Sequence, residues 1–200
     1  MLTRLKRRIQ SLLTTEAELL HDFGLTPNKI SAIGILLAFL ASWFYGTWRS
    51  NRLFLVVAPT LFLLSGFCDA LDGAVARLYG ETTAFGGFLD SLLDRYADAL
   101  IFITLIASGL CDVLWGSVAL AGSLLVSYVR AKGEAAGAKM ETIGLAERAE
   151  RIIILATASF VAFFWLEALN WGIIILAVLT NLTVLQRTIY FYQTSKQKES

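Results

Sequence analysis

The sequence predicts an all-α integral membrane protein, with six transmembrane helices and an N-terminal amphipathic helix at the membrane surface. Hydrophobic residues make up 56% of the 200 residues, more than a soluble domain of this size usually carries. Several long stretches contain no charged residue, and two of these stretches, 30–48 and 168–186, have 19 residues each. Because a spanning helix needs about 20 residues, these two stretches can cross a bilayer outright.

The N-terminal segment, 1–27, combines a basic cluster with apolar residues at helical spacing. The apolar residues are Leu2, Leu5, Ile9, Leu12 and Leu13, and the basic ones are Arg4, Lys6, Arg7 and Arg8. This pattern predicts an amphipathic helix that lies on an anionic membrane surface. A simple solvated run of charges is the alternative interpretation.

Six membrane helices are expected to follow, at 28–48, 52–79, 85–109, 113–137, 148–167 and 170–192, with a tail at 193–200. The connections are short, and we predict one membrane domain over 1–200, with 28–192 as the helix bundle. Most basic residues lie in segments that this topology places on one side of the membrane, and only Arg49 and Arg52 lie on the opposite side. The positive-inside rule therefore predicts a multi-pass cell-membrane protein with both termini in the cytoplasm.

Acidic residues lie inside two of these predicted helices, where each charge costs about 2.5–3.5 kcal/mol on insertion scales. Asp69 and Asp72 are three residues apart, and Asp90 and Asp94 are four apart, so each pair shares one helix face. The two helices should be antiparallel neighbours joined by a short turn. Both pairs are then expected to meet at one depth, toward the cytoplasmic side.

Four converging carboxylates suppress one another's ionisation unless cations are present. Mg²⁺ and Mn²⁺ prefer oxygen ligands, and two such ions form a recurring clamp for displacement at phosphorus. A cation or proton transporter would also place acids inside a membrane. The carboxylates alone leave the two interpretations open. The formal net charge of +1 argues against a nucleic-acid partner.

The full spacing is more specific, with eight fixed residues over 26 positions: Asp69-x2-Asp72-Gly73-x2-Ala76-Arg77-x8-Gly86-x3-Asp90-x3-Asp94. It resembles the signature of the CDP-alcohol phosphotransferase family. Thr26-Pro27-Asn28, at the start of the first membrane helix, resembles another element of that family. The resemblance implies an enzyme with six membrane helices, an N-terminal interfacial helix and a homodimeric assembly. A transporter or a non-catalytic membrane adaptor remains an alternative.

The resemblance also implies a role for each residue of the signature. Two ions, Mg²⁺ or Mn²⁺, would be bound. Asp69, Asp72 and Asp90 would hold the first, and Asp69, Asp90 and Asp94 would hold the second. Asp94 would also act as general base. The CDP group would be bound by Asp69, Asp72, Gly73, Ala76, Arg77, Gly86, Thr26 and Asn28. A hydroxyl would attack the β-phosphorus of a CDP-lipid, and CMP would leave at the cytoplasmic face.

Two further segments, 127–135 and 144–151, resemble the branch of the family that uses inositol phosphate. The resemblance implies an acceptor-phosphate pocket, for which the candidates are Arg130, Lys132, Arg148, Arg151 and Arg187. Inositol 1-phosphate is the predicted acceptor, with glycerol 3-phosphate or serine as alternatives. The donor could be CDP-diacylglycerol or CDP-archaeol, or a soluble CDP-inositol. Outside the signature, Arg95 is predicted to form an internal ion pair. Asp98 could support the site or be structural.

Overall fold

The chain folds into α-helices with short connections in the computed structural model, which describes residues 16–19, 23–140 and 143–199. The helices are α2 (Pro27–Gly46), α3 (Phe54–Leu78), α4 (Ala84–Ala107), α5 (Val113–Ala135), α6 (Arg148–Ala162) and α7 (Glu167–Glu199), with a 3₁₀ turn at Trp48–Ser50. No strand occurs among the described residues. The prediction of an all-α fold is therefore confirmed. The amphipathic helix predicted within 1–27 lies largely outside the described residues.

The helix ends follow local signals in the sequence. Pro27 occupies the first turn of α2, where its missing N–H costs no hydrogen bond. The Thr83 side chain caps α4 by accepting a hydrogen bond from the Gly86 backbone N–H at 2.9 Å. Between α3 and α4, Gly80 has a φ of +68°, a backbone conformation that glycine adopts without strain. These signals fix the reversal between the two acid-bearing helices.

Four helices, α2, α3, α5 and α7, are long and apolar enough to span a membrane. Among the described helices, α4 and α6 do not meet that criterion. Helix α4 carries Asp90, Asp94, Arg95 and Asp98, and α6 is only 15 residues long. Helix α6 ends at Ala162, earlier than predicted. Helix α7 continues through the expected tail, because the chain beyond Gly172 has no glycine or proline to stop it.

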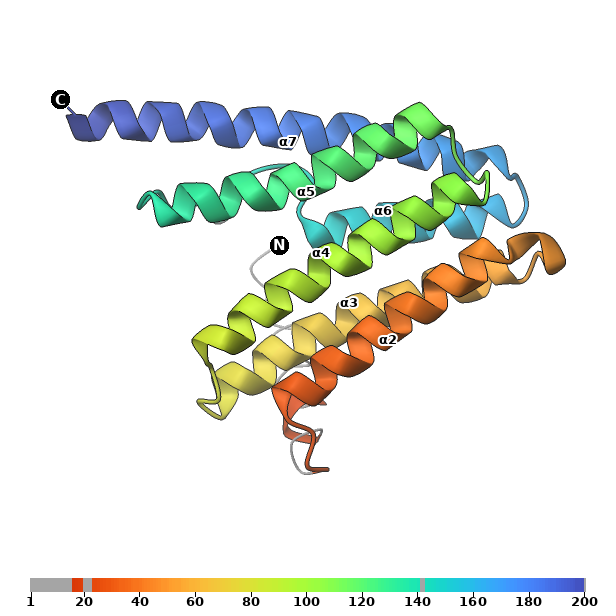
Figure 1. Cartoon of the computed structure of the whole chain (residues 1–200), viewed down its shortest axis with the longest axis horizontal. Helices are drawn as coiled ribbons and strands as arrows, with labels where there is room; N and C mark the ends of the chain where they lie inside the picture. Colours follow the sequence, from red (N-terminus) through yellow and green to blue (C-terminus); the bar gives the residue numbers. More distant parts are fainter. Residues whose placement is uncertain (1–15, 20–22, 141–142, 200) are drawn as a thin grey trace, which may run out of the picture.

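Helices α2, α3 and α4 form one group and α5, α6 and α7 form a second (Figure 1). Contacts that α4 and α6 make with the opposite group join the two. Helix α2 packs against α3 and α4, α7 packs against α5 and α6, and α6 and α4 reach across to α3 and α5. Helices α3 and α4 reverse direction at a short turn, as predicted, but they are not a closely packed pair. Within the described chain they diverge from their shared turn, and α2 packs against both. A short turn joins two helix ends, but the side chains decide which helix faces pack.

The interior of the bundle is apolar with a few satisfied polar pairs. Tyr45 on α2 and Ser159 on α6 are fully buried and lie 2.7 Å apart through their hydroxyl groups. Large apolar side chains also cover the outside, including Trp43 at 69% and Phe164 at 82% exposure. Exposed apolar surface of this extent is typical of a surface that contacts lipid or another protein.

Small residues allow close helix contact, and Gly122 on α5 gives a test of this packing. A Cβ added at Gly122 would collide with the Thr180 side chain of α7. We expect Gly122→Val to lower the free energy of unfolding by about 1–3 kcal/mol, the usual cost of overpacking. Thermal unfolding in detergent measures the effect. Ala121→Val, at an exposed position on the same helix, should change stability much less, and equal melting temperatures would contradict the packing.

Candidate active site

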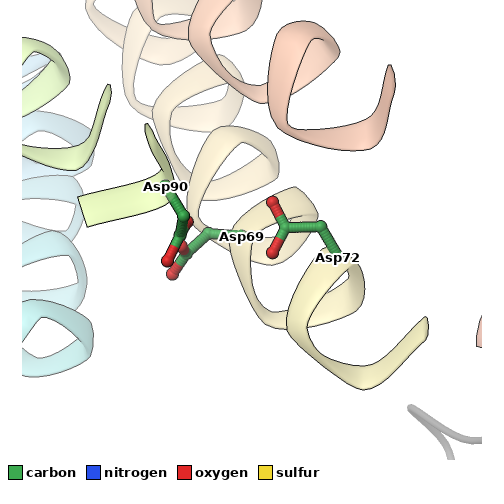
Figure 2. Close-up of side chains that lie close together, drawn as sticks. All are labelled: Asp69, Asp72 and Asp90. Atoms are coloured by element: carbon green, nitrogen blue, oxygen red, sulfur yellow. The ribbon is translucent and has the colours of Figure 1, made fainter. Parts of the chain in front are cut away.

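Three carboxylates converge at the place where α3 and α4 approach their shared turn. Asp69 and Asp72 on α3 and Asp90 on α4 each have an oxygen atom within 4.8 Å of the others (Figure 2). Asp72 is only 5% exposed. The i, i+3 spacing turns Asp69 and Asp72 to one side of α3. The predicted convergence of these three aspartates is therefore present in the structure.

Ser31 on α2 holds Asp72 in this cluster. Its hydroxyl lies 2.5 Å from Asp72 Oδ2 and 3.1 Å from the Pro27 backbone carbonyl. Ser31 was not among the residues predicted from the sequence. Its position, one helical turn after Pro27, could have indicated it, because residues at i and i+4 share a helix face. The Ser31 hydroxyl group therefore connects the first turns of α2 to the carboxylate cluster.

Asp94 joins the cluster through a cation from α6. Arg148 Nη1 lies 2.8 Å from Asp69 Oδ2 and 2.7 Å from Asp94 Oδ1. The predicted placement of Asp94 near Asp69 is thus present, with a guanidinium group between the two carboxylates. The oxygen ligands of this cluster suit Mg²⁺ or Mn²⁺. A positive charge already placed between two of the carboxylates shows that the cluster attracts cations, so the residues fit the predicted metals.

A large cavity of about 540 Å³ opens beside the cluster and contains seven of the eight residues predicted to bind CDP. Those seven are Thr26, Asn28, Asp72, Gly73, Ala76, Arg77 and Gly86. Asp69, the eighth, lines a smaller cavity of about 20 Å³ together with Asp72, Asp90, Asp94 and Arg148. The smaller cavity lies among the carboxylates. Asp72 and Asp90 line both cavities, so a diphosphate in the larger one would reach the carboxylate cluster.

Small residues and one cation shape a wall of the larger cavity. A Cβ added at Gly73 would lie 3.1 Å from Arg77 Nη1, so glycine leaves the guanidinium its present position. Arg77 offers a planar set of donors that matches phosphate oxygens. Phe85 and Phe88, which adjoin the lining residues Gly86 and Gly87 in the sequence, are 68% and 64% exposed. Exposed apolar side chains therefore lie next in sequence to residues of the cavity wall.

A second cavity of about 110 Å³ lies on the other side of Asp94 and is lined by five arginines. One is Arg95, and the others are Arg130, Arg148, Arg151 and Arg187, four of the five cations predicted for the acceptor phosphate. Lys132 is an exposed residue that is not in the lining. Residues two apart on a helix point to different sides, so Lys132 cannot share the face of Arg130. The structure therefore brings together all the predicted cations except Lys132.

The arginines of this second cavity are held by the protein. Arg151 Nη2 donates to Asp98 Oδ2 at 2.6 Å, and Arg151 Nη1 donates to the Ala146 carbonyl at 3.1 Å. Asp98 therefore lines the second cavity and pairs with one of its arginines, a position compatible with both of its predicted roles. Arg130 Nε donates to Glu134 at 2.9 Å near the surface. Arg95 forms the predicted ion pair, 3.7 Å from Asp94.

Arg187 is 1% exposed, and each of its three nitrogens has a protein partner. Nε and Nη1 donate to the Ile143 and Val126 carbonyls, each at 2.7 Å, and Nη2 donates to Glu147 at 3.3 Å. This arginine joins α5 and α7 to the loop before α6. Glu147 also lines the cavity, and although it lies in the segment 144–151, it was not among the predicted site residues. Arg187 supplies charge and fixes the cavity wall.

Comparison with known proteins agrees with this architecture. The family model for CDP-alcohol phosphatidyltransferase matches residues 24–185. An archaetidylinositol phosphate synthase from Pyrococcus horikoshii is 37% identical over all of this chain and 99% of its own length. One from Methanothermobacter thermautotrophicus is 43% identical over 86% of each chain. A phosphatidylinositol phosphate synthase from Mycobacterium tuberculosis is 34% identical over 82% of this chain and 78% of its own.

Solved structures of the Mycobacterium tuberculosis phosphatidylinositol phosphate synthase have a similar fold. The one with CDP-DAG bound has a TM-score of 0.77 and 29% identity, covering 91% of this chain and 94% of that one. Another, in complex with manganese and citrate, also has a TM-score of 0.77, with 30% identity, covering 90% of this chain and 88% of that one. These matches cover nearly the whole chain and confirm the family that the signature indicated. The chain belongs to the CDP-alcohol phosphatidyltransferase family of enzymes.

Proposed function

We propose that this chain transfers a lipid phosphate group from a CDP-lipid to inositol 1-phosphate and releases CMP. One observation carries the proposal. The carboxylate cluster lies between a large cavity lined by the CDP signature and a second cavity lined by five arginines. A donor diphosphate and an acceptor phosphate could therefore approach the cluster from opposite sides. The names of the archaeal and mycobacterial relatives support inositol phosphate as the acceptor.

The four carboxylates would have different roles in the reaction. Asp69, Asp72 and Asp90 would hold one Mg²⁺ or Mn²⁺ ion, and Asp69, Asp90 and Asp94 a second. Bound there, such ions neutralise phosphate charge and polarise the phosphorus that is attacked. Asp94 lines both the cluster and the arginine cavity, so it is the carboxylate that can accept the proton of the acceptor hydroxyl. The hydroxyl oxygen then attacks the β-phosphorus, and CMP leaves.

The donor and acceptor would be held by different residues. Gly73 and Ala76 leave room along the wall of the larger cavity, while Arg77 binds the diphosphate. Thr26, Asn28 and Gly86 complete the CDP site. The arginines bind the acceptor phosphate through charge-assisted hydrogen bonds. A transporter would need no residues of this kind at the signature spacing, and the family match favours the enzyme.

We further propose that all six helices, α2 to α7, belong to one membrane domain. Helices α4 and α6 bring their charged residues to the interior site, where intramembrane charges are tolerated. Both termini and the active site would face the cytoplasm, as the distribution of basic residues predicts. The exposed apolar surface would contact membrane lipids and, in a homodimer, a second copy of the chain.

A panel of acceptors tests the proposed reaction. Purified protein with Mn²⁺ and either CDP-diacylglycerol or CDP-archaeol is given inositol 1-phosphate, glycerol 3-phosphate, serine or free inositol. We expect CMP release to be fastest with inositol 1-phosphate, because only the phosphorylated acceptors use the arginines. A preference for glycerol 3-phosphate would overturn the inositol assignment and keep the phosphate cavity. A preference for serine would overturn both.

Arg130 gives a direct test of the phosphate cavity. Its only ion pair among the described residues is with the partly exposed Glu134, so Arg130→Ala should leave the fold intact. We expect the KM for inositol 1-phosphate to rise about tenfold, which corresponds to about 1.4 kcal/mol. The Kd for the CDP-lipid should stay constant. Lys139→Ala removes an exposed cation outside the cavity and serves as the control. An equal loss of affinity for both substrates would contradict the assignment.

A further inference from the structure

Arg148 occupies the boundary between the carboxylate cluster and the arginine cavity. It lines both cavities, and its side chain is 16% exposed. Besides Asp69 and Asp94, it lies 3.7 Å from Asp98 through Nε. Arg95 also lines the second cavity and lies 3.7 Å from Asp94, but among the described arginines only Arg148 forms ion pairs with two carboxylates of the cluster, Asp69 and Asp94. Arg148 can therefore act on either side of the boundary.

The contacts of Arg148 differ in kind from those of Arg151. Nε and Nη1 of Arg148 are buried and have no hydrogen bond of good geometry among the described residues, although acids lie close to them. Arg151 instead donates well-formed hydrogen bonds to Asp98 and to the Ala146 carbonyl. Charge attraction alone holds Arg148 at Asp69 and Asp94. Such a group can move when a stronger positive charge reaches the same oxygens.

A divalent ion bound by Asp69, Asp90 and Asp94 would need the oxygens that now face Arg148. The guanidinium group and the ion then compete, because one carboxylate oxygen cannot approach both cations equally. An arginine released from the cluster has the neighbouring cavity on its other side, where Arg130, Arg151 and Arg187 already lie. An anion in that cavity is the remaining partner for its charge.

We propose that Arg148 is a positioning residue that couples metal binding to acceptor binding. Without metal it neutralises Asp69 and Asp94; when the ion binds, the guanidinium group turns to the acceptor phosphate. The inference rests on the proposed metal and acceptor sites. It makes acceptor affinity depend on metal occupancy, and linkage requires the acceptor phosphate to strengthen metal binding by the same factor.

Calorimetric titration with Mn²⁺, in the absence of substrates, tests the competition. We expect two binding steps in the wild type and a second Kd about tenfold lower in Arg148→Gln, because the ion no longer displaces a cation. Arg130→Gln removes the same charge from the same cavity but touches no carboxylate of the cluster, so its second Kd should stay close to that of the wild type. An equal decrease in both variants, or none in Arg148→Gln, would overturn the proposal.

Sulfate binding, measured with and without Mn²⁺, tests the coupling. In the wild type, Mn²⁺ should strengthen sulfate binding, and sulfate should strengthen Mn²⁺ binding equally. In Arg148→Gln the coupling factor should fall to about one. If thermal unfolding shows that this variant is not folded, Arg148→Lys, which can pair with one carboxylate at a time, should give an intermediate factor. No coupling in the wild type would overturn the inference, whereas no Mn²⁺ binding at all would overturn the metal site itself.

Discussion

Asp69→Asn is expected to reduce turnover by more than about 10³-fold, since losing one group that stabilises transition-state charge already costs about 10²–10³-fold. Asp69 is central because it belongs to the carboxylate cluster and also pairs with Arg148. The substitution weakens both proposed ion sites at once. EDTA should have the same effect on the wild type, and added Mn²⁺ or Mg²⁺ should reverse it. CMP release measures turnover in each case.

Glu150→Gln is the matched control for Asp69→Asn, because it removes an exposed carboxylate of α6 and leaves the cluster intact. It should retain nearly full activity. Wild-type turnover that persists in metal-free buffer would refute the proposed two-metal mechanism. Strong CDP-lipid binding by Asp69→Asn in the presence of metal would show that Asp69 is not needed to bind the donor.

Asp94→Asn is expected to lower kcat by about 10²–10⁴-fold, the usual contribution of a general base. Asparagine keeps an oxygen near the cluster but cannot take the proton of the acceptor hydroxyl. The donor cavity is lined by Asp72 and Asp90 and not by Asp94, so the Kd for the CDP-lipid should change much less than kcat. Steady-state CMP release and equilibrium binding of the donor separate the two effects.

Arg95→Gln provides the control for Asp94→Asn. Arg95 lies 3.7 Å from Asp94 and carries a charge but cannot act as a base. Its loss should lower kcat much less than Asp94→Asn does, because the pair is partly exposed and such pairs contribute about 0–1 kcal/mol. Arg95 also lines the second cavity, so the comparison is made on kcat at saturating acceptor and not on the KM. If Asp94→Asn retains near wild-type kcat, another group takes the proton.

Features that depend on helix periodicity could be predicted from the sequence. The spacings of Asp69, Asp72 and Asp90 determined which helix faces carry the carboxylates, and the turn at Gly80 brought the faces together. The start of α6 at Arg148 was also predicted correctly, because charge gives way to apolar residues there. The same periodicity argues against Lys132 in the acceptor cavity, although proximity in sequence to Arg130 favoured it.

Features that depend on tertiary packing could not be predicted. Helices α3 and α4 each pack against α2 rather than closely against each other, and a connection of a few residues does not specify such packing. Arg148 reaches Asp69 across 79 positions of the sequence, through a long side chain whose direction no local pattern fixes. Arg187 was predicted as a cation of the acceptor pocket, but its burial was not predicted. It is buried because three separate segments supply partners for its nitrogens.

The exposed apolar residues next to the donor cavity bear on how the enzyme would meet its lipid. Phe85 and Phe88 are exposed and adjoin Gly86 and Gly87, which line the cavity, so we expect a lipid to place its diphosphate inside while its chains stay outside the protein. The donor then arrives by diffusion in the plane of the bilayer and never crosses water. For an enzyme of this kind, the relevant substrate concentration is the mole fraction of donor among the surrounding lipids. Inert phospholipid would therefore act as a diluent, even at a fixed amount of donor per volume.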